Sequence, residues 1–148
     1  MNIAIGSDHI GYNLKNKIVT YLVSKKDVDL VKDIGCDSDK SCDYPTFAHV
    51  VSEFLLYEPY QFGILICGTG QGMAITSNKY DHIRATVCWS SEISKLAREH
   101  NNSNVLCLPA KFINEGCVYD IVDTFLYTPF SEEQRHIKRI SKIKPRVK

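Results

Sequence analysis

The stretch that decides the fold is Phe62-Gly-Ile-Leu-Ile-Cys-Gly-Thr-Gly-Gln-Gly-Met-Ala-Ile75. A short apolar run, residues 63–66, ends in Cys67, and glycines then alternate with Thr69 and Gln71. After the glycines, apolar residues return at helical spacing. The pattern predicts a buried strand, a tight loop and the start of a helix.

The loop in this stretch contains Gly68, Gly70 and Gly72. Glycines let the backbone turn sharply and let a ligand approach the main chain closely. The N–H groups of such a loop and of the first helical turn favour negative charge. The spacing is G-x-G-x-G, which is neither the G-x-G-x-x-G of dinucleotide sites nor a loop followed by G-K-[ST]. A small anionic ligand is therefore favoured over a nicotinamide cofactor or a nucleoside triphosphate.

Cys67 lies where the predicted strand meets this loop. A helix N-terminus favours the thiolate form of a cysteine, so Cys67 is a candidate reactive group. Taken alone, a cysteine in an apolar run is more often a small packing residue. The six cysteines form no C-x-x-C pair and have no histidines at zinc-like spacing, so we expect free thiols and no metal site.

Length and composition indicate one domain spanning residues 1–148, because 44% of the residues are hydrophobic and 24% are charged. No apolar run approaches the roughly 20 residues needed to span a bilayer. The N-terminus also lacks a basic segment followed by an apolar stretch. We therefore expect a cytoplasmic protein without membrane contact.

The basic C-terminal segment, about residues 131–148, includes seven of the 18 cations within residues 135–148, which contain no acid. The remaining chain has 11 cations and 17 acids, so its net charge is −6 and that of the tail is +7. Such a tail is compatible with binding nucleic acid or small anions, or with a solvated helix end. No aromatic residue follows Phe130, and we therefore expect no nucleic-acid partner.

Strand and helix patterns alternate along the whole chain. Strands are predicted at residues 2–6, 28–34, 63–66, 83–88 and 105–108. Helices are predicted at residues 10–24, 43–55, 73–79, 90–100 and 112–127, and from residue 131 onward. This alternation is typical of an α/β protein whose parallel sheet is covered by helices on both faces.

Residues capable of chemistry gather where these elements end. In open parallel sheets, ligands bind beyond the carboxyl ends of the strands. Arg135 and Arg139 are four residues apart, so they share one helix face, and two guanidinium forks suit a phosphate dianion. Asp8 is also a candidate helix N-cap, and an isolated arginine pair is more often solvated. The full set consists of Asp8, His9, Tyr44, Cys67, His100, Asn101, Arg135 and Arg139.

Together these residues resemble ribose-5-phosphate isomerase type B, in the family that includes galactose-6-phosphate and allose-6-phosphate isomerases. The matching segments cover nearly the whole chain in collinear order. They are Ser7-Asp8-His9-Ile10-Gly11-Tyr12-Asn13-Leu14-Lys15, Asp43-Tyr44-Pro45, residues 63–73, Asn78-Lys79, Ile83-Arg84-Ala85, His100-Asn101, Asn104-Val105-Leu106 and Arg135-His136-x-x-Arg139.

The resemblance implies a three-layer α/β/α Rossmann-like sandwich with five parallel strands. It implies a homodimer, or a tetramer, with active sites at the subunit interface and no metal or organic cofactor. The implied reaction is the interconversion of ribose 5-phosphate and ribulose 5-phosphate in the pentose phosphate pathway. Lys111 stands where the family usually has an arginine.

The resemblance also assigns roles to the residues. Cys67 is the base that moves a proton between C2 and C1 through an enediolate, and Thr69 relays a proton between the two oxygens. The ring is opened by His100 with Asp8. The amides of Gly68, Gly70, Gln71 and Gly72 form the anion hole. His9, Arg135 and Arg139 bind phosphate, while Tyr44 and Asn101 position the sugar.

Two alternatives to this function remain open at this point. The same mechanism serves a six-carbon sugar 6-phosphate, such as galactose or allose 6-phosphate, because substrate length depends on pocket depth. The glycine loop and basic tail are also compatible with a phosphate-binding module that has no catalytic activity.

Overall fold

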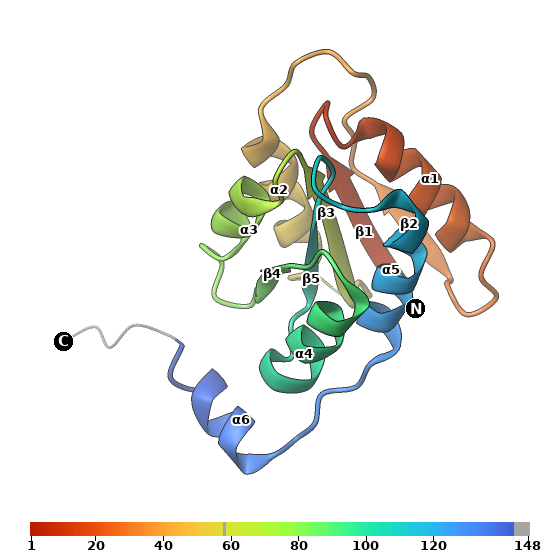
Figure 1. Cartoon of the computed structure of the whole chain (residues 1–148). Coiled ribbons are helices and arrows are strands. Elements are labelled where there is room, and N and C mark those ends of the chain that lie inside the picture. Colours follow the sequence, from red (N-terminus) through yellow and green to blue (C-terminus); the bar gives the residue numbers. More distant parts are fainter. Residues whose placement is uncertain (58, 144–148) are drawn as a thin grey trace.

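Five parallel strands form one sheet in the computed structural model, which describes residues 1–57 and 59–143 (Figure 1). The order across the sheet is β2-β1-β3-β5-β4. The strands are β1 (Asn2–Ser7), β2 (Leu30–Asp33), β3 (Phe62–Cys67), β4 (Ala85–Val87) and β5 (Val105–Pro109). The predicted five-stranded parallel α/β sheet is therefore confirmed, while the final tail cations, Lys144, Arg146 and Lys148, lie outside the described residues.

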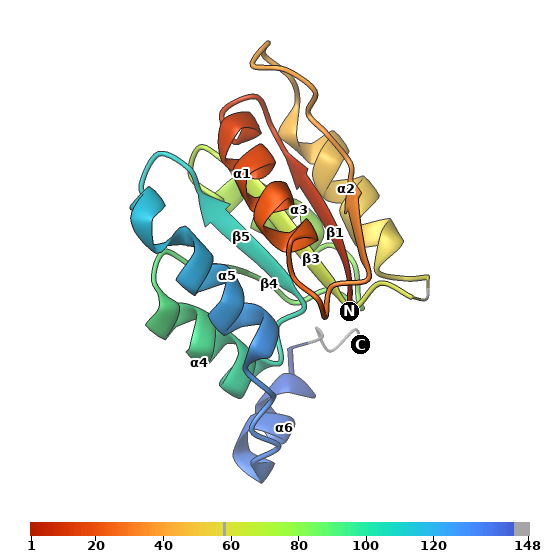
Figure 2. The same ribbon diagram turned by 90° about the vertical axis from the view of Figure 1, so that its right-hand side faces the viewer.

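Helices cover both faces of the sheet (Figure 2). They are α1 (Tyr12–Val23), α2 (Tyr44–Phe54), α3 (Gln71–Ser77), α4 (Ser91–Asn101), α5 (Val118–Tyr127) and α6 (Gln134–Ile140), with a 3₁₀ turn at Glu115–Cys117. Apolar residues of α1, α4 and α5 pack on one face, and those of α2 and α3 pack on the other. The described part of the chain includes no helix long and apolar enough to cross a membrane.

The two cores follow from strand periodicity, because successive side chains of a strand point to opposite faces. In β3, Ile64 and Ile66 pack beneath α1 and α5, whereas Leu65 and Cys67 face α2 and α3. The central strands are buried on both sides, which explains why their sequences are almost continuously apolar.

The order of the strands places a switch point between β1 and β3. From β1 the chain passes through α1 to β2 on one side, and it then returns through α2 to β3 on the other. The two connections leave the sheet in opposite directions, so a crevice forms outside the carboxyl ends of β1 and β3. Asp8 follows β1 directly, and Cys67 is the last residue of β3.

The fourth strand is shorter than the predicted residues 83–88, and side chains contact the backbone where it starts. The amide of Asn78 exchanges two hydrogen bonds with the backbone of Ala85, at 2.8 and 2.9 Å. The backbone N–H of Arg84 donates to Asn104 Oδ1 at 2.8 Å. The Arg84 N–H is thus bonded to a side chain, and strand pairing starts only at Ala85, which is in register with Val105.

Two helices also begin later than predicted. The predicted helix from residue 112 starts as a turn whose first residue, Phe112, is exposed, and α5 begins only at Val118. The last helix begins at Gln134 rather than at residue 131, because Glu132 adopts a left-handed φ of 55°. Glu132 and Glu133 therefore precede the helix.

Candidate active site

The β1–β3 pairing continues into the loop that contains Asp8. Ser7 is in register with Ile66, and the backbone N–H of Asp8 donates to the Ile66 carbonyl at 3.0 Å. This bond fixes Asp8 beside the end of β3, one residue before Cys67. The predicted pairing of Asp8 with the cysteine loop at one edge of the sheet therefore matches the structure.

Cys67 is buried, and a backbone amide is directed at its sulfur. The N–H of Gly70 donates to Cys67 Sγ at 3.1 Å. Gly70 has a left-handed φ of 72°, and a Cβ at this position would lie 3.1 Å from the Val87 side chain. Only glycine adopts this conformation without strain, so the sequence supplies the turn that directs the amide at the sulfur. An N–H donor stabilises a thiolate more than a thiol.

The neighbouring thiol below the site is not equivalent to Cys67. Cys107 is fully buried, and burial, reinforced by the nearby Cys67 and Cys88, raises the pKa of its thiol well above the ordinary value. Cys107 therefore stays protonated in the core. Cys67 differs from Cys107 in that its sulfur receives a backbone N–H donor beside the glycine loop.

The glycine loop is held from two sides. The Cys67 and Gly68 carbonyls accept hydrogen bonds from the backbone N–H groups of Ala110 and Lys111, at 2.9 and 3.0 Å. The N–H of Gln71 donates to Thr69 Oγ1 at 3.3 Å. Two amides of the predicted anion hole, at positions 70 and 71, thus already have partners in this structure.

Asp8 orders the turn before α1, although it does not cap the helix. Its Oδ1 accepts hydrogen bonds from the backbone N–H groups of Ile10 and Gly11, at 2.9 and 3.0 Å. The helix begins after Gly11 without a side-chain cap, so the alternative assignment of Asp8 as an N-cap is wrong. These two bonds hold the buried carboxylate at the site.

His9 is held by the loop that precedes α2. The backbone N–H of Cys42 donates to His9 Nδ1 at 3.3 Å. Because a backbone N–H can only donate, Nδ1 is the acceptor in this contact and Nε2 bears the ring proton in the neutral imidazole. A phosphate oxygen can accept a hydrogen bond from this ring N–H.

Tyr44 lies against the glycine loop from the start of α2. A Cβ on Gly72 would lie 2.6 Å from Tyr44 Cε2, so the ring occupies the space that a side chain would need. The ring is 39% exposed and therefore sits at the rim of the site. The structure thus brings Asp8, His9, Tyr44, Cys67, Thr69 and the glycine loop to one edge of the sheet.

A pocket of about 500 Å³ opens beside the loop. Two of its walls are aromatic and solvent-exposed, Trp89 at 55% and Phe112 at 72%. Its lining consists of Thr69, Gln71, Val87, Trp89, Pro109 and Phe112. Sequence reasoning did not single out Trp89 or Phe112. The available signal was their position in the loops that follow the fourth and fifth strands, at the edge where the site lies.

The remaining predicted residues lie toward the other edge of the sheet. Helix α4 starts after the carboxyl end of β4 and returns to the start of β5, so its last residues, His100 and Asn101, approach the amino edge. Helix α6 lies beside this end of α4, at the bottom of Figure 1. Within this one chain, the structure does not bring His100, Asn101, Arg135 and Arg139 to Cys67.

This second group is itself ordered. The ring of His100 packs on that of buried His136, with centroids 4.3 Å apart. Arg135 and Arg139 are exposed on α6, and Arg135 forms a 2.6 Å ion pair with Glu133. The arrangement leaves three cations, Arg135, Lys138 and Arg139, on the surface of the helix that packs against His100.

Arg84 anchors the end of α4. Its Nε donates to the carbonyls of Asn101 and Asn102, at 3.0 and 2.9 Å. Partial burial lowers the pKa of the Arg84 guanidinium, but the group remains a cation at the negative end of the helix. Sequence reasoning gave Arg84 no role beyond its motif, because nothing in the sequence indicates which carbonyls it contacts.

The switch point of the parallel sheet carries a thiol with a backbone donor, a glycine loop and an imidazole N–H. Together these groups define an α/β site for a small anionic substrate. The comparisons agree with this class. The family model described as Ribose/Galactose Isomerase matches residues 3–143. The chain belongs to this ribose/galactose isomerase family, which confirms the resemblance predicted from its motifs.

Individual relatives match over nearly their whole length. A ribose-5-phosphate isomerase B of Mycobacterium leprae is 36% identical, over 95% of this chain and 86% of the relative. The structure of the Clostridium thermocellum ribose-5-phosphate isomerase B has a TM-score of 0.91 at 42% identity, covering 97% and 95% of the two chains. That of the Mycoplasma genitalium enzyme with bound ribulose-5-phosphate has a TM-score of 0.88 at 40% identity, covering 96% and 93%.

Proposed function

We propose that this chain interconverts ribose 5-phosphate and ribulose 5-phosphate, with Cys67 as the base, in an active site completed by a second copy of the chain. Family membership supports the reaction. The observation that carries the assignment of the base is the Gly70 N–H aimed at the buried Cys67 sulfur, 3.1 Å away, at the edge of the sheet where Asp8 and His9 lie.

The proton transfer follows from this placement. The Cys67 thiolate removes the proton from C2 of the open-chain sugar, and the electron pair forms a C1–C2 double bond while O1 takes the negative charge. The Thr69 hydroxyl passes the O2 proton to O1. Cys67 then returns its proton to C1 as the carbonyl forms at C2. The loop amides other than those of Gly70 and Gln71, which already have partners, stabilise the enediolate, and one such donor contributes about 3 kcal/mol.

Binding and ring opening use the remaining residues. A phosphate dianion accepts from His9 Nε2–H and from the guanidinium groups of Arg135 and Arg139. His100, together with Asp8, moves the proton from O1 to the ring oxygen as the furanose opens. Tyr44 and Asn101 hold the sugar hydroxyls. Lys111 adds a cation, because its side chain extends beside Gly68.

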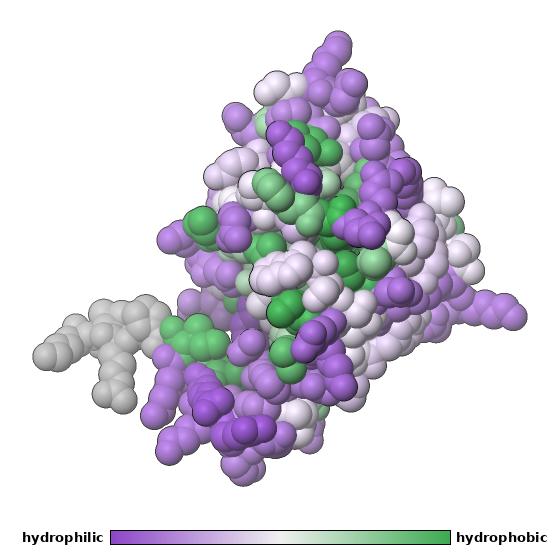
Figure 3. All heavy atoms as spheres, in the orientation of Figure 1, coloured by the Kyte–Doolittle hydropathy of each residue, from purple (hydrophilic) through white to green (hydrophobic). Residues whose placement is uncertain are grey.

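The second copy is required because these groups occupy opposite edges of the sheet in one chain. A two-fold dimer brings the amino edge of one copy to the carboxyl edge of the other. Several large apolar side chains are exposed, including Ile75 at 62% and Trp89 at 55%, as an interface needs. Figure 3 shows apolar residues gathered over the face on which β4 and α4 lie in Figure 1. We place this enzyme in the cytoplasm.

The test is the rate of ribulose 5-phosphate formation by the purified protein and by Cys67→Ala. We expect Cys67→Ala to lose at least about 10²-fold in kcat, the scale of a missing acid–base group. The matched control is Cys117→Ala, because Cys117 is an exposed thiol, and it keeps full activity. Circular dichroism confirms that each variant is folded.

Two results would contradict parts of the proposal. A folded Cys67→Ala that retains the parental rate removes cysteine as the base while leaving the reaction in place. A parent inactive on ribose 5-phosphate and active on galactose or allose 6-phosphate moves the substrate to six carbons.

A further inference from the structure

Two cysteines outside the catalytic set face each other beside His9. Cys36 and Cys42 both lie in the connection between β2 and α2, and their sulfurs are 3.2 Å apart. Both are free thiols. The Cys42 thiol donates to Cys36 Sγ, and the Cys36 thiol donates to the Ser38 carbonyl at 2.9 Å. The mechanism above uses neither thiol.

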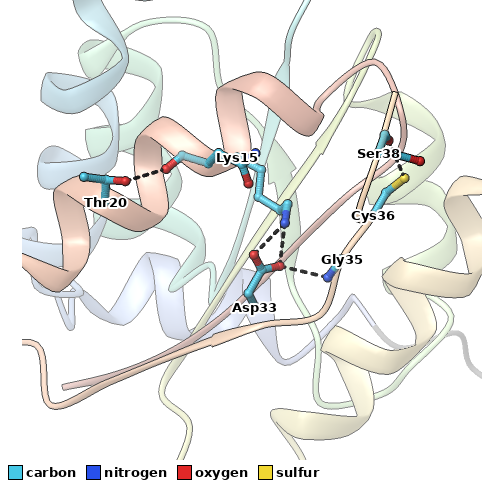
Figure 4. Close-up of polar contacts among 7 residues, drawn as sticks. Lys15, Thr20, Asp33, Gly35, Cys36 and Ser38 are labelled. Atoms are coloured by element: carbon cyan, nitrogen blue, oxygen red, sulfur yellow. Dashed lines mark hydrogen bonds and ion pairs between the residues drawn. The ribbon is translucent and has the colours of Figure 1, made fainter. Parts of the chain in front are cut away.

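The Cys36 side of the pair is fixed to the sheet. The Cys36 N–H donates to the Ser7 carbonyl at 2.9 Å, and the Ser7 N–H donates to the Gly35 carbonyl at 2.7 Å. The Gly35 N–H donates to Asp33 Oδ1 at 2.8 Å, and the Asp33 carboxylate pairs with buried Lys15 at 2.5 and 2.7 Å (Figure 4). A shift of this end would disturb this ion pair, in which Lys15 is buried and Asp33 is exposed.

The Cys42 side is tied instead to the substrate site. Cys42 is half-buried, so small molecules in solution reach its sulfur more readily than that of buried Cys36. Its backbone N–H donates to His9 Nδ1 at 3.3 Å, and its sulfur lies 3.8 Å from the same ring nitrogen. Any displacement of Cys42 therefore acts directly on the orientation of the His9 ring.

We propose that Cys36 and Cys42 form a modification site that small disulfides oxidise to an intramolecular disulfide, and that this bond weakens substrate binding through His9. The Cys42 thiolate attacks the reagent's S–S bond, forming a mixed disulfide and releasing one thiolate. The Cys36 thiolate then attacks Cys42 Sγ and releases the second. The protein loses two protons and two electrons, and the reagent disulfide is reduced to two thiols.

The geometry determines which residue moves. A disulfide holds its sulfurs about 2.05 Å apart, so the pair must close by about 1.1 Å from its present 3.2 Å. Cys36 is held by the sheet, and the loop residue Cys42 makes the approach. The Cys42 N–H then shifts relative to His9 Nδ1. The imidazole ring follows this shift, and its Nε2–H, which we assign to phosphate binding, no longer points at the phosphate.

The charges around the pair determine the conditions for the reaction. Burial, together with the hydrogen bond to Cys36 and the charge of Asp8, raises the pKa of the Cys42 thiol to about 11, while the contact with His9 opposes this rise. The reduced Cys42 thiol is therefore uncharged at neutral pH, and oxidation accelerates as the pH rises, because the thiolate is the nucleophile.

The experiment treats the reduced full-length protein with glutathione disulfide at a series of alkaline pH values, because the Cys42 thiol, whose pKa is raised, becomes a nucleophile as the pH rises. Digestion without reductant and mass spectrometry then locate the bond. We expect a peptide pair joined at Cys36 and Cys42 that has lost two hydrogens, and faster formation at higher pH. The KM for ribose 5-phosphate rises about fivefold, the equivalent of one lost hydrogen bond, with a smaller change in kcat, and dithiothreitol restores it.

The controls separate this site from the other thiols. Cys36→Ser and Cys42→Ser cannot form the bond, and their KM stays constant under the same treatment. Cys117→Ser, which changes an exposed thiol, behaves like the parent. If no Cys36–Cys42 bond forms while Cys117 becomes glutathionylated, the proposal is overturned. If the bond forms and the KM stays constant, its connection to His9 is wrong. The mass readout is independent of the proposed function, and only the KM readout rests on it.

Discussion

At the scale of single residues, backbone amides and glycines determine the geometry around Cys67. The left-handed Gly70 directs its N–H at the sulfur, and the missing side chain of Gly72 makes room for the Tyr44 ring. Both effects arise because glycine has no side chain. Substituting these positions therefore changes the site without removing any of the groups assigned to the chemistry.

The contact between Gly72 and Tyr44 yields a first prediction. In Gly72→Ala the new methyl lies 2.6 Å from the Tyr44 ring, which must move outward because it sits at the exposed rim. We expect kcat/KM for ribose 5-phosphate to fall by about tenfold, since small misplacements of positioning groups are costly. The melting temperature changes little, because alanine favours a helix by about 1 kcal/mol relative to glycine and offsets the displaced ring.

A double-mutant cycle checks the cause. In a Tyr44→Ala background no ring is present to displace, so Gly72→Ala adds little further loss and the two effects are strongly non-additive. Gly116→Ala is the matched control, because its new methyl meets only the exposed end of Asn114, at 3.3 Å. Strictly additive losses would show that the methyl acts on the loop itself and not through Tyr44.

At the scale of elements, α6 is attached to the body through a buried histidine. His136 Nδ1 lies 2.7 Å from Ser131 Oγ, and its ring packs on His100 of α4. Burial, and then the nearby charges of His100 and Arg135, lower the pKa of His136. Docking of the helix that bears the arginines therefore depends on an uncharged imidazole.

This dependence predicts a loss of stability in mild acid. A histidine has a pKa of about 6.5 in the unfolded chain, and that of His136 is lower in the folded protein. Between the two values the unfolded state binds more protons, so the free energy of unfolding falls as the pH drops below about 6.5. We expect the urea midpoint to decrease between pH 7.5 and 5.5, and to decrease less in His136→Gln.

The control for this prediction is His49→Gln, because His49 is exposed whereas His136 is buried. We expect this variant to keep the pH dependence of the parent. Equal pH slopes in the parent and in His136→Gln would show that another group accounts for the acid sensitivity. Hydrogen exchange of α6 amides at the two pH values locates the opening.

The sequence predicted the elements well where burial determines them, and their ends less well where single contacts do. The central strands were found because both faces are buried and their sequences are continuously apolar. The start of β4 follows the contact of the Arg84 N–H with the Asn104 side chain, and the start of α6 depends on the left-handed Glu132. Hydrophobic periodicity indicates neither a side-chain contact to the backbone nor a residue in the left-handed conformation.

In the candidate site, likewise, some contacts were predictable from the sequence and others were not. Asp8 and Cys67 were predictable together, because parallel strands end at one edge and both residues follow apolar runs. The contact of Cys42 with His9 was not, since it joins two loops whose conformations the pattern leaves open. The separation of His100 from Cys67 follows from the direction of α4, which was itself predictable.

At the scale of the whole molecule, the functional groups form two sets on opposite edges of one sheet. Cys67 and His9 belong to the carboxyl edge, and His100 and Arg139 belong to α4 and α6. In the dimer proposed above, a two-fold axis would bring each edge to the opposite edge of the partner and so form two identical composite sites. A monomer would then contain both sets and no complete site.

Complementation between two inactive variants tests this arrangement. Cys67→Ala lacks the proposed base, and His100→Ala lacks the group proposed for ring opening, so each homodimer is inactive. In a mixed dimer, one site combines the intact Cys67 of one copy with the intact His100 of the other, and the second site lacks both. Random exchange makes half the dimers mixed, so about one quarter of the parental sites become active. Isomerase activity that appears on unfolding and refolding the two variants together, and not separately, supports composite sites. Persistent inactivity in refolded mixed dimers, verified by differently tagged chains, would mean that each site draws Cys67 and His100 from the same chain.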